Sequence, residues 1–324
     1  MVNHCKRLIV VVPAYNESQI IKKSVTKLSE VLKHLIDQQL VSKESKLLFV
    51  NDGSEDDTWD QLISFHKENS LVTAINFSRN FGHQNAIIGG LTEAYDYGDI
   101  FITIDADLQD DPWAIVEMVK SYYEGFDVVY GVRESRTTDT LFKRSTAGLF
   151  YTLMSKLGVK MVPEAADFRL TSKRVVKQLL SYSERNLFLR GIVPDIGFPS
   201  TNVYYSRKER ELGETKYPLR KMIGLAWDGI TSFSMAPMRF VLFLGIFSLT
   251  VSFIMLVYTL GQHIWGDTVR GWSSLMLSIW FIGGSQLIGL AIFGEYLGKV
   301  FNNTKQRPRF IVQDNLLKEG QDNA

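Results

Sequence analysis

Short apolar runs alternate with segments of helical periodicity from the N-terminus onward, and this alternation limits the possible folds more than any other feature of the chain. The apolar runs, which we assign as β-strands, are Leu8–Val12, Leu47–Val50, Thr73–Phe77, Ile100–Ile104 and Val128–Tyr130. The helical segments between them are Ser18–Ile36, Asp57–His66, His83–Tyr95 and Pro112–Tyr123. Strands that alternate with helices predict an α/β domain in which helices cover both faces of a mostly parallel sheet.

Polar and charged residues follow every one of these strands. The segments are Pro13–Glu17, Asn51–Ser54, Ser78–Gly82, Asp105–Asp107 and Gly131–Arg133. Each contains a carboxylate or an arginine, although ordinary turns and helix caps use such residues too. In open α/β sheets, ligands bind beyond the carboxyl ends of the strands. The five segments together are therefore the predicted site.

The tripeptide Asp105-Ala106-Asp107 follows an apolar strand that ends abruptly in charge. Two carboxylates one residue apart suit Mg²⁺ or Mn²⁺, because such ions take one or two carboxylates and fill the remaining positions with substrate phosphates and water. A lone D-x-D motif is weak evidence, and a polar turn is the alternative. In the company of the other strand ends, the tripeptide predicts a metal-bound nucleotide diphosphate, with the choice between Mg²⁺ and Mn²⁺ left open.

Length and charge exclude some classes of protein. The chain has 324 residues, which suits about two domains, and its formal net charge is +1. This balance of charge gives no reason to expect a broad nucleic-acid-binding surface. Cys5 is the single cysteine, so no disulfide can staple the fold, which suits a reducing cytosolic environment for the catalytic part.

The composition changes beyond Arg239. The stretches Phe240–Gly266 and Gly271–Gly294 contain no Asp, Glu, Lys or Arg. A membrane-crossing helix needs about 20 apolar residues, so both stretches are candidate spans, with a pair of buried core helices as the alternative. Ahead of them, Pro218–Phe233 carries apolar residues at helical spacing and predicts an amphipathic helix at the membrane surface, although a plain core helix remains an alternative.

The charges around these stretches predict how the chain lies in the membrane. Lys and Arg flank the pair on both outer sides, whereas the connecting loop holds only Asp267 and Arg270. Positive residues stay inside, so we expect both termini in the cytoplasm and the short connecting loop outside. The expected domains are residues 1–217 (catalytic), 218–238 (interfacial), 239–298 (hairpin with spans at about 240–260 and 273–293) and 299–324 (cytoplasmic tail).

Several motifs carry a resemblance to a known family. They are VVPAYNE, VNDGSEDDT, NFSRNFG, DADLQDDP, GVRESR, ADFRL, ERNLF, WDGITSFSMAPMR and GLAIFGEYLGKVF, and they extend over almost the whole chain. With them the chain resembles the family-2 inverting glycosyltransferases of the GT-A fold. More narrowly, it is similar to polyprenyl-phosphate glycosyltransferases, in particular to bactoprenol (undecaprenyl-phosphate) glucosyl- and N-acetylglucosaminyltransferases. It is related to the dolichol-phosphate mannose synthases.

The chain departs from the pattern of close relatives at His83, where they often carry lysine. A neutral imidazole cannot replace a fixed ammonium group at a phosphate, so the role of this position is open. The Q-x-x-R-W signature of the processive polysaccharide synthases is absent from the sequence.

The resemblance implies roles for particular residues. Metal ligands would be Asp105, Asp107 and Gln109. The nucleotide sugar would bind to Pro13, Ala14, Tyr15, Glu17, Asp52, Ser54, Arg79 and Asp105. The catalytic residues would be Asp105, Asp107, Arg133, Arg169 and Lys216. The acceptor phosphate would meet Arg133, Arg136, Arg144 and Lys216, with Lys143 as a further candidate.

The implied reaction transfers a sugar from UDP-glucose or UDP-N-acetylglucosamine to undecaprenyl phosphate, giving a β-linked lipid-phosphate sugar for cell-envelope glycans. The lipid phosphate is already an oxyanion, so positioning and electrostatic stabilisation matter more than a general base. A flippase and a second glycosyltransferase would use the product; homo-oligomerisation is left open. The resemblance also implies the inner membrane of a bacterium as the location, with the catalytic domain in the cytoplasm. The alternatives are transfer to another lipid or glycan, or a lipid-sugar flippase component.

Overall fold

The computed structural model describes residues 5–133, 162–163, 165–184, 188–206, 236–265 and 271–319. The chain divides into two compact units. The first comprises Met1–Ser155, Lys160–Lys216 and Arg307–Ala324, and the second comprises Lys156–Val159 and Tyr217–Gln306. The C-terminal residues therefore belong to the same unit as the N-terminal ones.

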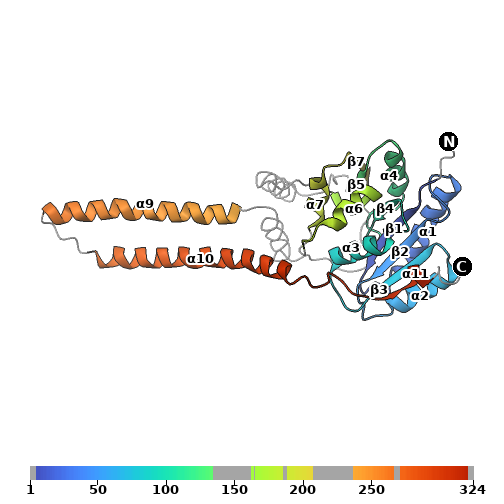
Figure 1. Cartoon of the computed structure of the whole chain (residues 1–324), viewed down its shortest axis with the longest axis horizontal. Helices are drawn as coiled ribbons and strands as arrows, with labels where there is room; N and C mark the ends of the chain where they lie inside the picture. The colour runs from blue at the N-terminus through green and yellow to red at the C-terminus, as the bar shows by residue number, and fades with distance from the viewer. Residues whose placement is uncertain are drawn as a thin grey trace. The chain divides into compact units, whose positions relative to one another are not determined.

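The first unit is built on a mixed sheet with the strand order β7-β5-β6-β4-β1-β2-β3-β8 (Figure 1). The strands are β1 (Leu8–Ala14), β2 (Lys46–Asn51), β3 (Val72–Phe77), β4 (Ile100–Thr103), β5 (Val128–Arg133), β6 (Ala165–Ser172), β7 (Ser200–Tyr205) and β8 (Val312–Asn315). β1 pairs in parallel with β2 and β4, β2 with β3, and β5 with β7. β6 runs antiparallel between β4 and β5. The five strands expected from the sequence are confirmed as β1 to β5, and the α/β class with them.

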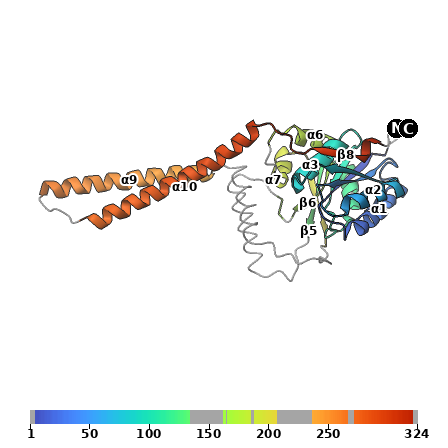
Figure 2. The same ribbon diagram turned by 90° about the horizontal axis from the view of Figure 1, so that it is seen from below.

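The helices of this unit are α1 (Ile21–Asp37), α2 (Thr58–Glu68), α3 (His83–Ala94), α4 (Ala114–Tyr123), α6 (Lys173–Ser181), α7 (Leu189–Ile196) and α11 (Leu316–Glu319). α1 contacts α2 and α4, whereas α3 contacts α6, and α6 contacts α7 (Figure 2). The two groups cover opposite faces of the sheet. Successive side chains of a strand point to opposite faces, so neighbouring residues of β1 show which helix lies on which face. Val10 and Val12 share a core with the apolar stripe of α1, while Val11 faces Gly90 of α3.

α3 lies very close to the strands beneath it. A Cβ atom on Gly90 would come within 2.4 Å of Val11 Cγ1, and one on Gly89 within 2.4 Å of the Phe77 ring. Close packing of this kind requires glycine, and it brings the first residue of α3 to the carboxyl ends of β1 and β2.

Within residues 299–324, expected as a cytoplasmic tail, Val312–Asn315 forms β8 at the edge of the sheet. β8 pairs antiparallel with β3, with Asn76 opposite Asp314. The ring of Phe310 stacks on Phe77, with ring centroids 5.2 Å apart. Sequence periodicity missed this strand, because Val312–Asn315 is too short and too polar to stand out.

The second unit contains α9 (Ala236–Trp265) and α10 (Trp272–Thr304), two helices that lie side by side (Figures 1 and 2). The two uncharged stretches of the sequence lie within them apart from residue 266 and residue 271, and large apolar side chains such as Phe243 and Leu287 are exposed. Among the described residues, no helix is long and apolar enough to cross a membrane. The two expected spans are therefore not found there. The expected interfacial helix, residues 218–233, lies outside the described residues.

Candidate functional site

A pocket of about 380 Å³ opens at the carboxyl ends of four neighbouring strands. Its lining consists of Pro13, Ala14, Tyr15, Glu17, Asp52, Asn80, Gly82, His83, Ala86, Asp105, Ala106 and Asp107. These residues follow β1, β2, β3 and β4, whose parallel run in the sheet brings their ends to one edge. Seven residues expected to bind nucleotide sugar or metal therefore meet in one place: Pro13, Ala14, Tyr15, Glu17, Asp52, Asp105 and Asp107.

Ser54 does not line the pocket but holds one of its loops by a hydrogen bond. The Asn16 backbone N–H donates to Ser54 Oγ at 2.9 Å, and the Glu55 N–H donates to Asn16 Oδ1 at 2.9 Å. Asn16 has a φ of 55°, a left-handed conformation that asparagine tolerates better than most residues. These contacts join the loops after β1 and β2, so Ser54 shapes the wall that Tyr15 and Glu17 form.

Arg79 is placed differently from the expectation. Its guanidinium lies 3.9 Å from the centroid of the Phe81 ring and donates to the Asn80 carbonyl at 2.9 Å. It is absent from the pocket lining, although its neighbours Asn80 and Gly82 belong to it. The loop after β3 therefore presents Asn80 and Gly82 to the pocket, whereas its arginine packs on Phe81.

Asp52 connects the loop after β2 to the loop after β3. Its carboxylate accepts hydrogen bonds from the Phe81 N–H at 2.7 Å and the Gly82 N–H at 2.9 Å. Burial raises the pKa of Asp52, and the two backbone donors offset only part of that effect. The residue is 2% exposed, so it holds the shape of the pocket and presents little surface to a ligand.

Asp105 and Asp107 both line the pocket, as a pair of metal ligands would. Burial raises the pKa of Asp105 to about 6; the charge of His83 opposes this effect, while Asp167 and Asp107 add to it. A divalent cation fits such a place, because it would offset the crowded negative charge and needs only one or two protein carboxylates. Within the described part of the chain, no group of three or more His, Cys, Asp or Glu is arranged to hold a metal.

Gln109 is not among the lining residues, and it is 8% exposed. Its backbone N–H donates to Asp107 Oδ1 at 3.1 Å. This contact orients the Asp107 carboxylate through the main chain. Of the three expected metal ligands, Gln109 is therefore the one that this structure supports least.

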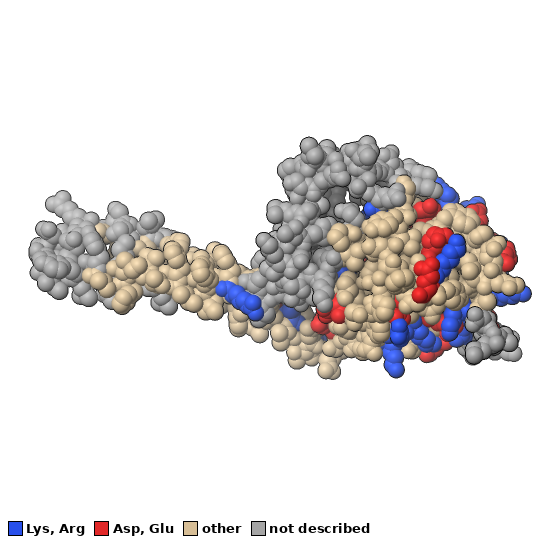
Figure 3. All heavy atoms as spheres, turned by 90° about the horizontal axis from the view of Figure 1, so that it is seen from above, with Lys and Arg blue, Asp and Glu red and all other residues tan. Residues whose placement is uncertain are grey.

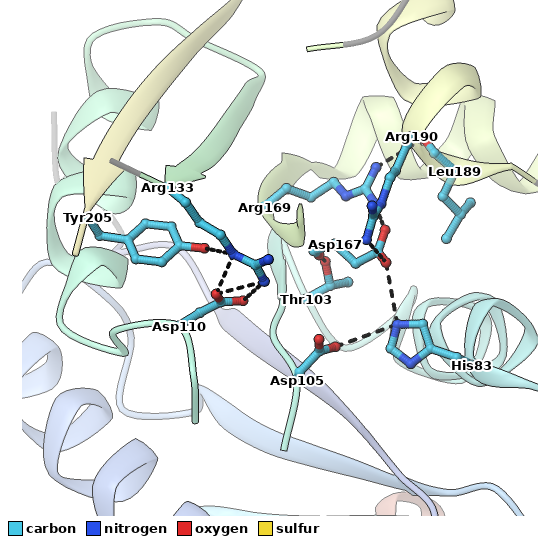
Figure 4. A network of polar contacts seen from close by, with 10 residues as sticks. All are labelled: His83, Thr103, Asp105, Asp110, Arg133, Asp167, Arg169, Leu189, Arg190 and Tyr205. Carbon is cyan, nitrogen blue, oxygen red and sulfur yellow. Dashed lines mark hydrogen bonds and ion pairs between the residues drawn. The ribbon is translucent and has the colours of Figure 1, made fainter. Parts of the chain in front are cut away.

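A network of charged side chains borders the pocket on the side of β6 (Figure 4). Asp167 Oδ1 lies 2.7 Å from Arg169 Nη2, and Asp167 Oδ2 lies 3.2 Å from Arg190 Nη2. Burial alone would raise the pKa of Asp167, but the hydrogen bond to His83 and the charges of Arg169 and Arg190 outweigh it and hold the pKa well below its usual range. Asp167 is therefore a fixed anion at neutral pH.

Arg169, expected as a catalytic residue, is buried among protein partners. It is 3% exposed, its Nη2 pairs with Asp167, and its Nη1 donates to the Leu189 carbonyl at 3.1 Å. A buried guanidinium with these partners stabilises the Asp167 carboxylate from the protein interior. The more accessible cation is Arg190, whose side chain is 39% exposed. The family motif ERNLF ends two residues before Arg190, but Arg190 was not among the expected site residues.

His83 joins this network to the aspartate pair. Its Nε2 lies 3.5 Å from Asp105 Oδ1 and 3.5 Å from Asp167 Oδ2. Burial alone would lower the pKa of His83, but the hydrogen bond to Asp167 and the negative charge of Asp105 outweigh it and raise the pKa. These surroundings favour the imidazolium more than water does, and the role of this position stays open.

Arg133 belongs to a second network, on the other side of Asp105 in Figure 4. Its Nε donates to Asp110 Oδ1 at 3.0 Å and to the Tyr205 hydroxyl at 3.4 Å. Asp110 is 2% exposed, so Arg133 compensates a buried carboxylate. The Arg133 side chain keeps 25% of its surface exposed and can still meet an anion.

The remaining expected cations, Arg136, Lys143, Arg144 and Lys216, lie outside the described residues. Their roles at the acceptor phosphate stay predictions.

Comparison with known proteins identifies the class. The model of the family described as "Glycosyl transferase family 2" matches residues 9–180, and the chain belongs to this family. It is a glycosyltransferase with an α/β fold of the GT-A type.

Individual relatives are similar over almost their full length. The chain is 48% identical over 312 residues to "Uncharacterized glycosyltransferase YkoT" of Bacillus subtilis (strain 168), covering 96% of this chain and 93% of that protein. It is 37% identical over 317 residues to the "Bactoprenol glucosyl transferase" of Shigella phage SfV, covering 96% and 100%. It is 38% identical over 309 residues to the "Prophage bactoprenol glucosyl transferase homolog" of Escherichia coli (strain K12), covering 95% and 98%.

Proposed function

We propose that this glycosyltransferase transfers a hexose from a UDP-sugar to undecaprenyl phosphate, with inversion at the anomeric carbon and with Mg²⁺ or Mn²⁺ as cofactor. The observation that carries the proposal is the pocket at the strand ends, where Asp105 and Asp107 share one lining with Ala14 and Asp52. Carboxylates beside a nucleotide-sized hollow suit a metal-bound diphosphate.

UDP-glucose is the proposed donor. Relatives at 37% and 38% identity over nearly the whole chain are named for glucosyl transfer to bactoprenol, which supports glucose over other sugars. UDP-N-acetylglucosamine is the alternative donor. The two sugars differ by an acetamide group, and a donor panel separates them.

Asp105 and Asp107 would hold the cation, which would neutralise charge on the leaving diphosphate. The protein's own part is electrostatic. Arg190 and Arg133 are partly exposed cations on either side of Asp105 in Figure 4, suited to a second anion brought close to the first. Because a lipid phosphate is already an oxyanion, no side chain has to remove a proton from it.

We propose that the protein acts at the bacterial inner membrane, with the catalytic unit and both termini in the cytoplasm. Exposed apolar side chains on α9 and α10 support contact with lipid, because large exposed apolar surfaces mark interaction sites. In Figure 3 the visible described atoms of these helices are almost all uncharged, whereas charges of both signs are spread over the first unit. A polyprenyl acceptor is itself a membrane lipid, which favours the same location.

Product analysis tests the function. The full-length protein, given undecaprenyl phosphate and a panel of nucleotide sugars, should form one lipid-linked product from UDP-glucose, with a β-linkage detected by NMR. A product from UDP-N-acetylglucosamine alone would change the donor. Transfer only to another lipid or to a glycan would contradict the acceptor. Movement of lipid-linked sugar between leaflets without any transfer would favour the flippase alternative.

The location is tested by two deletion variants. Truncation before Arg239 removes the helices and also β8, whereas replacing residues 236–306 with a flexible Gly/Ser linker retains β8. We expect the linker variant to bind UDP but to transfer poorly to undecaprenyl phosphate in vesicles, and to leave the membrane fraction. Turnover of the long-chain lipid at the native rate would show that the helices act only as a tether. Release of the full-length protein by alkaline carbonate would contradict an integral membrane location.

A further inference from the structure

The C-terminal strand is connected to the pocket by side chains that run across the sheet. At its start, Ser78 N–H donates to the Ile311 carbonyl at 3.0 Å, next to the stacked rings of Phe310 and Phe77. At its end, Asn315 Nδ2 donates to Glu93 Oε2 of α3 at 2.8 Å. β8 therefore touches both β3 and α3, the two elements that flank the loop Ser78–Gly82.

One side chain of β8 begins a continuous series of hydrogen bonds. Asn76 Nδ2 donates to Asp314 Oδ2 at 2.9 Å, and Asn51 Nδ2 donates to Asn76 Oδ1 at 2.7 Å. Ser54 Oγ donates to Asn51 Oδ1 at 2.5 Å, and the Asn16 N–H donates to Ser54 Oγ at 2.9 Å. The series crosses β8, β3 and β2 and ends in the loop after β1. We call it the asparagine relay.

The direction of the relay is set at Asp314. An ionised carboxylate only accepts hydrogen bonds, so Asn76 must turn its NH₂ group toward it and its carbonyl toward Asn51. Asn51 must then offer its NH₂ to Asn76 and its carbonyl to Ser54. Asn51 is 1% exposed and Asn76 is 8% exposed, so an unsatisfied amide here is costly.

The relay ends where the pocket begins. Asn16 lies between Tyr15 and Glu17, and Asn51 directly precedes Asp52, and all three of these neighbours line the pocket. None of the relay side chains lines the pocket. Their effect on a ligand therefore has to pass through the backbone that they hold.

We propose that Asp314 is a positioning residue for the donor nucleotide: through the asparagine relay it fixes the loops after β1 and β2 in the shape that receives the nucleoside diphosphate. The proposal rests on the proposed function in taking a UDP-sugar as the donor. It makes the segment that follows α10 a part of the active site. The acceptor side is unaffected, because Arg133 and Arg190 take part in other networks.

Three single variants test the proposal in the full-length protein. Asp314→Leu removes the acceptor at similar volume, Asp314→Asn keeps an oxygen that can accept from Asn76, and Gln313→Ala changes an exposed neighbour on the same strand. We expect Asp314→Leu to raise the KM for UDP-sugar and the Kd for UDP roughly fivefold to tenfold, the scale of one ordinary hydrogen bond, because the effect reaches the ligand only through the backbone. The KM for undecaprenyl phosphate and kcat should stay within about twofold. Asp314→Asn and Gln313→Ala should resemble the native protein.

A swap of the two partners gives a stricter test. Asn76→Asp alone places two carboxylates in contact and should weaken UDP binding more than Asp314→Leu does. Combining it with Asp314→Asn restores a donor and an acceptor in reversed order, so UDP affinity should return to within about twofold of native, a coupling that a double-mutant cycle measures. Failure of the double variant to recover, when it folds, would overturn the relay.

Amide hydrogen exchange separates this proposal from the proposed function. In Asp314→Leu, exchange at Asn16 should rise well above native, whereas it should stay native in Gln313→Ala. Unchanged exchange at Asn16 would overturn the proposal whatever the donor is. Equal increases in both KM values, or a lowered unfolding midpoint with unchanged UDP affinity, would show a merely structural role. Absence of any transfer by the native protein would instead overturn the proposed function, while the exchange measurement still decides the relay.

Discussion

The two halves of the sheet contribute to the site in different ways. In the parallel half, β1 to β4 end at the pocket, and the Asp52 carboxylate accepts hydrogen bonds from the Phe81 and Gly82 N–H groups. In the mixed half, antiparallel β6 places the start of its own strand beside the end of β4, and the side chains there form ion pairs around Asp167. The parallel half is shaped by its loops, and the mixed half by ion pairs that involve guanidinium groups.

This difference predicts different failures on mutation. Changes in the parallel half should weaken the binding of the donor and the metal. Changes in the mixed half should lower the stability of the fold or weaken the binding of the second anionic substrate. Four predictions test the division, in order of expected effect.

Asp107→Asn should have the largest effect on activity. Loss of a carboxylate charge beside the cation removes an electrostatic stabiliser, worth about 10²–10³-fold in kcat. EDTA should abolish activity of the native protein, and Mg²⁺ or Mn²⁺ should restore it. Asp111→Asn, a nearby carboxylate outside the pocket lining, is the matched control and should stay near native. Full activity in EDTA would remove the cation from the mechanism.

Arg169→Ala should mainly destabilise the fold. Removing a buried partner leaves the Asp167 carboxylate less compensated, which costs about 3–5 kcal/mol of unfolding free energy. Arg190→Ala should cost less stability, because the side chain is 39% exposed, and should raise the KM for the lipid acceptor more strongly. Chemical denaturation together with both KM values measures the contrast. Equal stability losses in the two variants would show that burial does not separate their roles.

Arg133→Ala should raise the KM for undecaprenyl phosphate about tenfold, the scale of one charge-assisted contact, and leave the KM for UDP-sugar nearly unchanged. Asp110→Asn should produce a weaker change in the same direction, because it frees the guanidinium without removing it. Tyr205→Phe removes the hydroxyl that contacts Arg133 at 3.4 Å and also Asp110, keeps both charges, and serves as the mild control. An increase confined to the donor KM would place Arg133 on the nucleotide side.

The pH dependence of stability should be the smallest effect, and it is best measured in EDTA without substrates. The pKa of Asp105 is raised from 3.8 to about 6, so the folded state holds its proton longer and the free energy of unfolding should fall as the pH rises through this window. His83, whose pKa is raised above 6.5, adds stability at lower pH that is lost as the pH rises through its folded pKa.

Two variants separate these contributions. Asp105→Asn should flatten the slope below pH 6, and His83→Gln should flatten the slope above pH 6.5. Denaturation midpoints measured across this range, each compared with native protein, give the two slopes. An unchanged slope in both variants would contradict the coupling of His83 to Asp105.

Local pattern predicted much of the fold and part of the site. β1 to β5 and the gathering of Pro13, Asp52, Asp105 and Asp107 follow from short-range periodicity and from the polarity of parallel strands. The positions of Arg79 and Ser54 did not follow, because a loop can turn a side chain toward the pocket or away from it at the same sequence spacing. The burial of Arg169 did not follow either, since it depends on helix α7 and the Leu189 carbonyl.

What the sequence alone determined is the family, the class of fold and the pair of aspartates at a strand end, because each depends on residues near one another in the chain. Only the tertiary structure decided that His83 bridges Asp105 and Asp167, that Asp110 holds Arg133, and that β8 returns to pair with β3. These contacts join segments far apart in sequence through strand order. Strand order is set by how the whole sheet packs, which no local pattern of residues records.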